Sequence, residues 1–329
     1  MRLALTYAGE NTLTLRPELS ARSYTPRGRT LRSTLPRTIS ARVVGSNPKG
    51  YAMPKSLQRP VVLLTGASSG IGYDVAPLLV RYGYTVYGAA RRVEKIEELA
   101  SEGVKALSMD VTDEASMEAA VQQIIDAEGR IDVLINNAGY GSYGAIEDVP
   151  IDEARRQFEV NLFGLARLTQ LVLPHMRAQG SGRILNISSM AGRITMPLGS
   201  WYHATKYALE AFSDALRMEV AEFGIDVIII EPGGIKTPWG LIAADHLEES
   251  SRNGVYAAQA QRVAANMRRL YSPSSNLSEP KVISNAILRA LEARRPKTRY
   301  LVGFGAKPSV FLHTVLPDRL FDKVARHIF

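Results

Sequence analysis

Apolar positions from residue 60 onward follow two periods in turn. Short apolar runs predict buried strands, and the segments between them carry an apolar residue every three or four positions, which predicts helices with one buried face. Strands that alternate with helices predict a parallel sheet covered by helices on both faces. The expected strands are 61–64, 85–89, 105–109, 131–135, 183–187, 226–230 and 299–302. The predicted fold class is therefore α/β, with a doubly wound parallel sheet in a single domain.

The same periodicity predicts the helices and the limits of the domain. After a first helix that ends near residue 82, helices are expected at 93–102, 114–127, 151–178, 200–224 and 279–293. Residues 239–278 carry scattered apolar and aromatic side chains and predict two helices. We expect these helices to form a lid over the candidate site that the motifs below define. The domain is expected to span 59–303, lid included. We expect the tail, 304–329, to pack against the domain or a partner subunit rather than on a membrane.

The formal net charge of +8 arises in the first part of the 329-residue chain. Residues 1–59 hold eleven Lys and Arg against two Asp and Glu, a net charge of +9, whereas residues 60–329 have a net charge of −1. A domain that binds nucleic acid through a basic face would carry the excess charge in its folded part. We therefore expect no nucleic-acid partner.

Residues 1–58 predict a basic, disordered extension, apart from a possible short strand or helix within 1–15. The segment is rich in Arg, Ser and Thr, poor in acidic residues, and interrupted by five prolines. Three interpretations stay open: an organelle transit peptide, a solvated tail, and an over-long start in which Met53 is the true initiator.

Composition excludes several classes of protein. A hydrophobic fraction of 46% allows a full core. The chain has no cysteine, so disulfides and thiolate metal sites are excluded. No apolar run approaches the ~20 residues of a membrane span. We expect no transmembrane segment and a cytoplasmic location.

A glycine-rich stretch follows the first predicted strand and precedes the first predicted helix. Glycines at such a junction let the backbone turn tightly and approach a pyrophosphate, whose charge is stabilised by free amides and the positive helix end. A plain glycine turn is the alternative. The residues expected to contact a dinucleotide here are Gly66, Ser68, Ser69, Gly70, Ile71 and Gly72.

The second predicted strand ends where dinucleotide folds select between NAD and NADP. An acidic side chain there binds the ribose hydroxyls of NAD, whereas arginine pairs with the additional phosphate of NADP. This chain has Ala90 at the acidic position, followed by Arg91 and Arg92. The pattern favours NADP(H). The alternative is that both arginines are solvated or pair with Glu94 or Glu98.

Later strand ends supply further candidate residues. Asp110 and Val111 are placed to bracket an adenine at the edge of the sheet. Small and amide residues after the fourth strand suit a close-packed cofactor wall, although a tight turn uses the same types; they are Asn137, Ala138 and Gly139. Asn161 is a polar residue on the apolar face of a predicted helix, where it needs a hydrogen-bond partner.

Tyr202 and Lys206 are four residues apart on a predicted helix and share one face. An ammonium close to a phenol favours the phenolate, so we expect the pKa of Tyr202 to be lowered from roughly 10 toward the working pH. Such a tyrosine is a candidate general acid and base for a carbonyl or an alcohol. A packed ring beside a solvated amine is the ordinary alternative for an isolated pair.

Taken in order, these motifs resemble the short-chain dehydrogenase/reductase family over residues 60–303, and most closely its 17β-hydroxysteroid-dehydrogenase-like branch. The resemblance implies a Rossmann-type fold. It implies that Tyr202 is the proton donor, that Lys206 lowers the pKa of the tyrosine and holds the nicotinamide ribose, and that Ser189 orients the substrate oxygen. Asn161 corresponds to the residue that holds a water in the proton relay. Further cofactor contacts are implied for Pro232, Gly233, Ile235 and Thr237.

One departure from the family pattern is that His203 and Thr205 stand where many members have small residues or serine. The catalytic positions are intact, and no metal is implied. The predicted function is an NADP(H)-dependent oxidoreductase that interconverts a ketone and a secondary alcohol, on a bulky apolar substrate of steroid-like, lipid or aromatic type. The alternative is a non-catalytic NADP(H)-binding regulator or scaffold. The resemblance also implies a homodimer or homotetramer.

Overall fold

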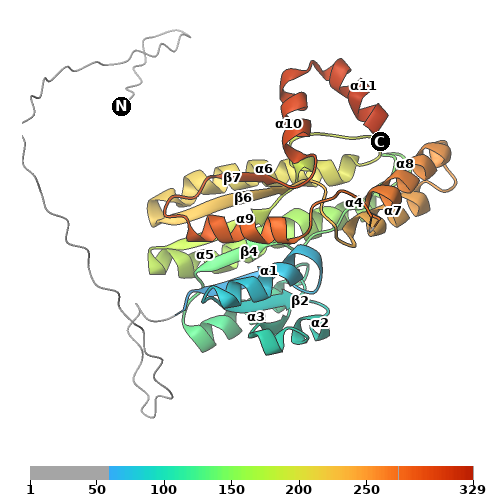
Figure 1. Cartoon of the computed structure of the whole chain (residues 1–329). Coiled ribbons are helices and arrows are strands. Elements are labelled where there is room, and N and C mark those ends of the chain that lie inside the picture. The colour runs from blue at the N-terminus through green and yellow to red at the C-terminus, as the bar shows by residue number, and fades with distance from the viewer. Residues whose placement is uncertain (1–58, 273, 329) are drawn as a thin grey trace, which may run out of the picture. The chain divides into compact units, whose positions relative to one another are not determined.

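The computed structural model describes residues 59–272 and 274–328, so the predictions for residues 1–58 lie outside the described residues. A seven-stranded parallel sheet forms the centre of the domain (Figure 1), in the order β3-β2-β1-β4-β5-β6-β7. The strands are β1 (Val61–Thr65), β2 (Thr85–Ala90), β3 (Lys105–Ser108), β4 (Val133–Asn136), β5 (Gly182–Ile187), β6 (Ile225–Pro232) and β7 (Arg299–Val302). The predicted doubly wound Rossmann-type sheet is confirmed.

Helices cover both faces of this sheet. The longer ones are α1 (Gly70–Arg81), α3 (Glu114–Glu128), α4 (Ile151–Phe158), α5 (Gly164–Gln179), α6 (Ser200–Val220), α7 (Trp239–Ser250), α8 (Ala257–Leu270), α9 (Lys281–Glu292), α10 (Ala306–Val315) and α11 (Asp318–Ile328). Short elements are α2 (Glu94–Glu97), η2 (Ala100–Glu102), η3 (Glu159–Phe163), η4 (Met190–Gly192) and η5 (Ala221–Phe223). Within the described residues, no helix is long and apolar enough to cross a bilayer.

The core has two layers because side chains of a strand alternate between the two faces of the sheet. Val62 and Leu64 pack beneath α1 and α9, which lie side by side in Figure 1. Val61 and Leu63 pack on the opposite face, against α3, α5 and α6. All four side chains are essentially inaccessible to solvent. A strand buried on both faces explains the continuous apolar run at 61–64.

The helix predicted over 151–178 is interrupted. One π-helical turn, η3, separates α4 from α5, and Asn161 lies in it. The amide of Tyr140 donates to Asn161 Oδ1 at 3.1 Å, while Asn161 Nδ2 donates to the carbonyl of Tyr140 at 2.9 Å and to Thr205 Oγ1 at 3.2 Å. The buried amide is therefore satisfied by partners outside its own helix. Single π turns inside α-helices are common at functional sites.

The turn between β1 and α1 requires glycine for two different reasons. Gly66 and Gly70 have φ angles of +67° and +57°, which disfavour residues with a side chain. A Cβ on Gly72 would lie 2.4 Å from the carbonyl oxygen of Gly66 and 2.7 Å from Asn137 Nδ2. Gly72 thus allows α1 to begin against the loop, and the loop to lie against the end of β4.

The tail folds back onto the domain through α10 and α11. Val310, Phe321 and Ala325 form a buried apolar cluster with Ile194, which follows η4. The apolar face of α11 therefore covers the segment after β5.

Replacing Gly72 by alanine should displace the β1–α1 loop. Overpacking of this kind costs about 1–3 kcal/mol of unfolding free energy, and we expect weaker NADPH binding as well, because the loop moves. Gly129→Ala is the control: Gly129 has a φ of +69° and no neighbour within 4 Å of an added Cβ, so it is strained but far from any close contact. Thermal unfolding and NADPH fluorescence titrations measure both effects. Equal NADPH affinities for the two variants would contradict the prediction.

Candidate active site

A cavity of about 1060 Å³ lies at the carboxyl ends of the strands. Ligand sites of open α/β sheets form at this edge, where the strand order reverses beside the first strand. Every predicted site residue lines this cavity except Gly72 and Asn161. The cofactor contact of Gly72 stays a prediction; what the structure shows is that its lack of a side chain serves helix packing. Asn161 lies behind the cavity wall, where its side chain holds Tyr140.

The glycine loop is held by side chains from the neighbouring strand ends. Asn137 Nδ2 donates to the carbonyl oxygens of Thr65 at 2.9 Å and Gly66 at 3.1 Å, and Thr65 Oγ1 accepts from the amides of Asn137 and Ala138 at 2.9 Å. A Cβ on Gly70 would lie 3.4 Å from Thr237 Cγ2. The loop after β6 thus closes against the glycine loop, and both line one cavity.

Arg91 and Arg92 are exposed and line the cavity directly after β2. In the part of the chain that the structure describes, neither guanidinium forms an ion pair, and Glu98 is paired with Lys95 at 2.8 Å. The two arginines therefore present free positive charge at the edge of the cavity.

Tyr202 is buried, with 7% of its surface exposed. Burial raises the pKa of its phenol, and a hydrogen bond with the Ser189 hydroxyl opposes this change. The expected lowering of the Tyr202 pKa by Lys206 is thus wrong, because desolvation of a phenolate outweighs its favourable neighbours. A raised pKa keeps the phenol protonated, which is the form that donates a proton.

Lys206 is buried beside the tyrosine. Its Nζ donates to the carbonyl of Ile187 at 2.9 Å and lies 5.9 Å from the centre of the Tyr202 ring. Burial lowers the pKa of Lys206 to about 8, and the negative charge of Glu210 opposes this effect.

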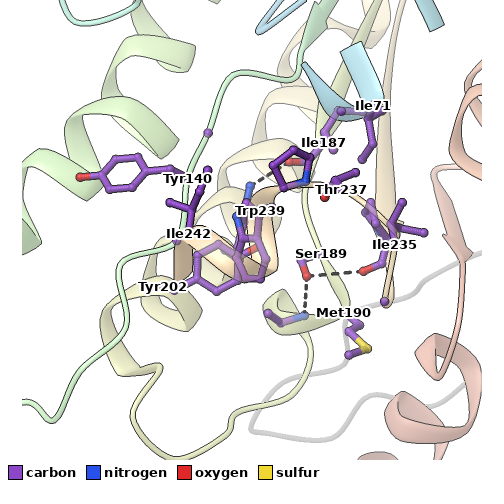
Figure 2. Close-up of a pocket in the computed structure, with 18 of the residues that line it drawn as sticks. Ile71, Tyr140, Ile187, Ser189, Met190, Tyr202, Ile235, Thr237, Trp239 and Ile242 are labelled. Atoms are coloured by element: carbon purple, nitrogen blue, oxygen red, sulfur yellow. Dashed lines mark hydrogen bonds between the residues drawn. The ribbon is translucent and has the colours of Figure 1, made fainter. Parts of the chain in front are cut away.

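The Ser189 side chain is oriented by the short turn that follows it. Its Oγ accepts from the amide of Ala191 at 3.1 Å and donates to the carbonyl of Pro232 at 3.4 Å. Figure 2 shows Ser189, Tyr202 and Trp239 gathered at one place in the cavity. The hydroxyl and the phenol therefore converge, as their predicted roles require.

A cluster of aromatic rings around Tyr202 forms one wall of the cavity. The rings of Trp239 and Tyr143 have their centres 5.1 Å and 5.7 Å from that of Tyr202, and Tyr271 lies 6.4 Å from Trp239. A Cβ on Gly141 would lie 2.4 Å from the Trp239 ring, so that position must remain small. Apolar side chains of α7 and α8 extend this wall; they are Ile242, Val263, Met267 and Leu270.

The C-terminal helices add lining residues that the sequence analysis missed. Leu312 of α10 and three side chains of α11 face the cavity; the latter are Phe321, Val324 and Ala325. Their spacing of three and four residues marks one face of a helix. That signal is readable in the sequence, but it does not reveal which surface the face covers.

His203 and Thr205, which depart from the usual family pattern, both make structural hydrogen bonds. His203 is buried, and its Nδ1 lies 3.0 Å from the carbonyl of Ala191, which can only accept, so Nδ1 carries the proton. Thr205 Oγ1 donates to the carbonyl of Tyr202 at 2.8 Å. These contacts attach the start of α6 to the η4 turn and to Asn161.

Comparison with known proteins identifies the family. Residues 60–243 match the model of the short chain dehydrogenase family. A 3-ketodihydrosphingosine reductase of Bacteroides thetaiotaomicron is 36% identical and covers 75% of this chain and 89% of its own length. An NADPH-dependent 3-dehydrocapnine reductase of Ornithobacterium rhinotracheale is 34% identical and covers 80% of this chain and 94% of its own.

A solved structure agrees with this assignment. The crystal structure of a short-chain dehydrogenase from Streptomyces avermitilis has a TM-score of 0.67 and 34% identity, and covers 82% of this chain and 99% of its own. The chain belongs to the short-chain dehydrogenase/reductase family. Its place in the 17β-hydroxysteroid-dehydrogenase-like branch stays a prediction.

Burial of neutral His203 should make the stability of the protein depend on pH. Burial lowers the pKa of His203, so below the unfolded value of about 6.5 the unfolded chain takes up a proton that the folded one does not. The free energy of unfolding therefore falls as pH decreases through the window between the two pKa values. His203→Asn, whose amide can still donate to Ala191, should lose less stability than wild type between neutral and acidic pH.

Urea unfolding across this range measures the effect, with His175→Asn on α5 as the control. Parallel pH profiles for wild type and His203→Asn would contradict the prediction.

Proposed function

We propose that this chain is an NADP(H)-dependent oxidoreductase that reduces a ketone on a bulky apolar substrate to a secondary alcohol. The observation that carries the proposal is the convergence of a buried, protonated Tyr202, the Ser189 hydroxyl and the buried Lys206 in one cavity. Two relatives that are named as reductases support reduction as the direction of the reaction.

The residues of the cavity fit a dinucleotide. A Cβ on Gly66 would lie 2.9 Å from the Ala138 backbone, so glycine at this position lets the loop pack closely against the end of β4. The glycine loop would hold the pyrophosphate at the start of α1, and Lys206 and Thr237 would hold the nicotinamide end. When bound, the nicotinamide supplies the hydride that the carbonyl carbon receives.

In the proposed mechanism, the protein handles the proton and the developing charge on oxygen. Ser189 donates a hydrogen bond to the carbonyl oxygen, and Tyr202 transfers its phenolic proton to that oxygen as the alcohol forms. The Lys206 ammonium stabilises the resulting phenolate, and both side chains are buried, which strengthens that interaction. Asn161, which lies in the π turn η3, is proposed to hold a water molecule of the proton relay. The reverse reaction uses the same groups in the opposite order.

The preference for NADP(H) is part of the proposal. Arg91 and Arg92 are unpaired among the described residues and lie directly after β2, where the ribose of the adenosine half binds in this fold. Arginine binds a phosphate through two parallel hydrogen bonds. The name of one relative, an NADPH-dependent reductase, supports the same choice.

The apolar substrate class rests on the composition of the cavity. Trp239 and Tyr143 pack against the Tyr202 ring, Tyr271 packs against Trp239, and α11 adds apolar side chains to the lining of the cavity. Pockets with a large apolar lining and a few convergent polar groups suit large apolar ligands. A homodimer or homotetramer and a cytoplasmic location complete the proposal.

Removing the phenolic hydroxyl tests the proposed acid. Tyr202→Phe should lower kcat for ketone reduction by about 10²–10⁴-fold and leave NADPH affinity nearly unchanged. Tyr143→Phe is the matched control, because this second buried tyrosine lies 5.7 Å away, ring centre to ring centre, and is given no role in proton transfer; it should keep most of the wild-type kcat. Assays use NADPH oxidation with ketones graded from short aliphatic to steroid-sized.

A Tyr202→Phe variant as active as wild type would refute the mechanism. A wild-type protein that binds NADPH and reduces no ketone would favour the non-catalytic regulator.

Cofactor preference is tested by removing both arginines. Arg91→Ala with Arg92→Ala should weaken NADPH binding about 10–100-fold, since hydrogen bonds to charged groups contribute about 1.5–3 kcal/mol, and should leave NADH binding unchanged. Arg81→Ala removes another exposed arginine, paired with Glu102 at 3.0 Å, and serves as the control. An equal loss for both cofactors would show that the arginines do not recognise the phosphate.

A further inference from the structure

A group of buried charges lies directly behind the proposed active site and has no role in the mechanism above. Glu210 is on α6 one turn after Lys206, and Glu231 is at the end of β6. Glu210 and Glu231 are only 6% and 1% exposed. A buried carboxylate costs several kcal/mol unless it is paired, so two of them at this position require an explanation.

Arg299 of β7 joins these carboxylates. Its Nε donates to Glu210 Oε2 at 3.0 Å and lies 3.5 Å from Glu231 Oε1, while its Nη2 donates to Asp214 Oδ2 at 2.6 Å. Arg193 Nη1 donates to Glu231 Oε1 at 3.1 Å. One guanidinium therefore connects α6, β6 and β7.

The turn that carries Ser189 lies against this network. Arg193, at the end of the turn, binds Glu231, and Ser188, at its start, lies close enough to Glu210 to lower the pKa of the Glu210 carboxyl. Between them, a Cβ on Gly192 would lie 2.9 Å from both Glu210 Cγ and the carbonyl oxygen of Lys206. The Glu210 side chain thus packs against the turn that carries Ser189. It lies on the same helix as Lys206, one turn further along.

We propose that Glu210 is a positioning residue of the active site: its carboxylate, anchored by Arg299, keeps the buried Lys206 ammonium charged and holds the Ser189 turn against α6. The inference depends on the proposed function in one respect, which is that Lys206 acts in the reaction as a cation.

The electrostatics agree with this geometry. Burial lowers the pKa of Lys206, and Glu210 is the charged group that opposes the effect. Burial and Glu231 raise the pKa of Glu210 itself, while Ser188 and Arg299 lower it. The titratable and charged groups around the pair are Tyr202 and Asp214 on α6, Glu231 on β6, Arg299 on β7 and Arg193 after η4.

The competing explanation is that Glu210 and Arg299 form a purely structural ion pair. A comparison of Glu210 with Asp214 distinguishes the two explanations. Asp214 lies one turn further along α6 and binds the same guanidinium, but its side chain is 37% exposed, so solvent screens its charge and it is further from Lys206 than Glu210 is. Asp214→Asn and Glu210→Gln both remove one carboxylate from Arg299 and preserve side-chain shape. Only Glu210→Gln removes the negative charge next to Lys206.

The decisive measurement is the titration of Lys206 in the full-length, cofactor-free protein. Lysine labelled with ¹³C at Cε reports the protonation of each ammonium by NMR, and Lys206→Met assigns the signal. Wild type should titrate near pH 8, the lowered pKa given above. Glu210→Gln should move the midpoint down by about one pH unit, Asp214→Asn should not move it, and Glu210→Asp should restore most of the wild-type value.

A midpoint that is the same in wild type and Glu210→Gln would overturn the proposal, as would an equal shift in Asp214→Asn. If Glu210→Gln does not fold, the double variant Glu210→Met with Arg299→Leu removes both buried charges together, a change that proteins often tolerate, and it should show the same lowered midpoint.

Enzyme kinetics supply a second readout. The pH at which kcat/KM for ketone reduction declines on the alkaline side should fall in Glu210→Gln by the same amount as the NMR midpoint. A wild-type protein that reduces no ketone would refute the proposed function, while the NMR titration would still decide the role of Glu210.

Discussion

Burial of the Lys206 ammonium is the constraint on which the rest of the site depends. A cation without water needs partners, and this one has the Ile187 carbonyl at 2.9 Å and the charge of Glu210 one helical turn away. These two partners lie at the end of β5 and on α6, so satisfying the lysine also fixes the helix against the strand. Tyr202 and Ser189 are carried by the same two elements, and their convergence follows from that packing.

One side of the site is joined by hydrogen bonds, and the other is assembled from apolar contacts between distant parts of the chain. The glycine loop, the strand ends and the start of α6 are joined by backbone and side-chain hydrogen bonds within the sheet core. The opposite wall comes from α7, α8 and the tail helices, which contribute mainly aromatic and apolar contacts. In the proposed reaction, such a division would keep the reacting groups in place, while the wall proposed to contact the rest of the substrate would be able to differ between relatives of the same family.

Much of the fold was predictable because strand and helix periods are local properties. The seven strands appear at the predicted segments, and the residues of the glycine loop other than Gly72 line the cavity. The failures have long-range causes. The helix over 151–178 breaks at Asn161 because its amide bonds to Tyr140, and the helix predicted over 93–102 ends early in a 3₁₀ turn.

By itself, the sequence determined the parallel α/β sheet, the glycine loop after β1, the paired arginines after β2, and the placement of Tyr202 and Lys206 on one helical face. Each of these depends on spacing along the chain. Only the tertiary structure decided the direction of the Tyr202 pKa shift, the contribution of α11 to the cavity, and the meeting of Glu210 with Arg299. These depend on burial and on partners far away in sequence, because a protonation equilibrium and an ion pair respond to everything packed around a group.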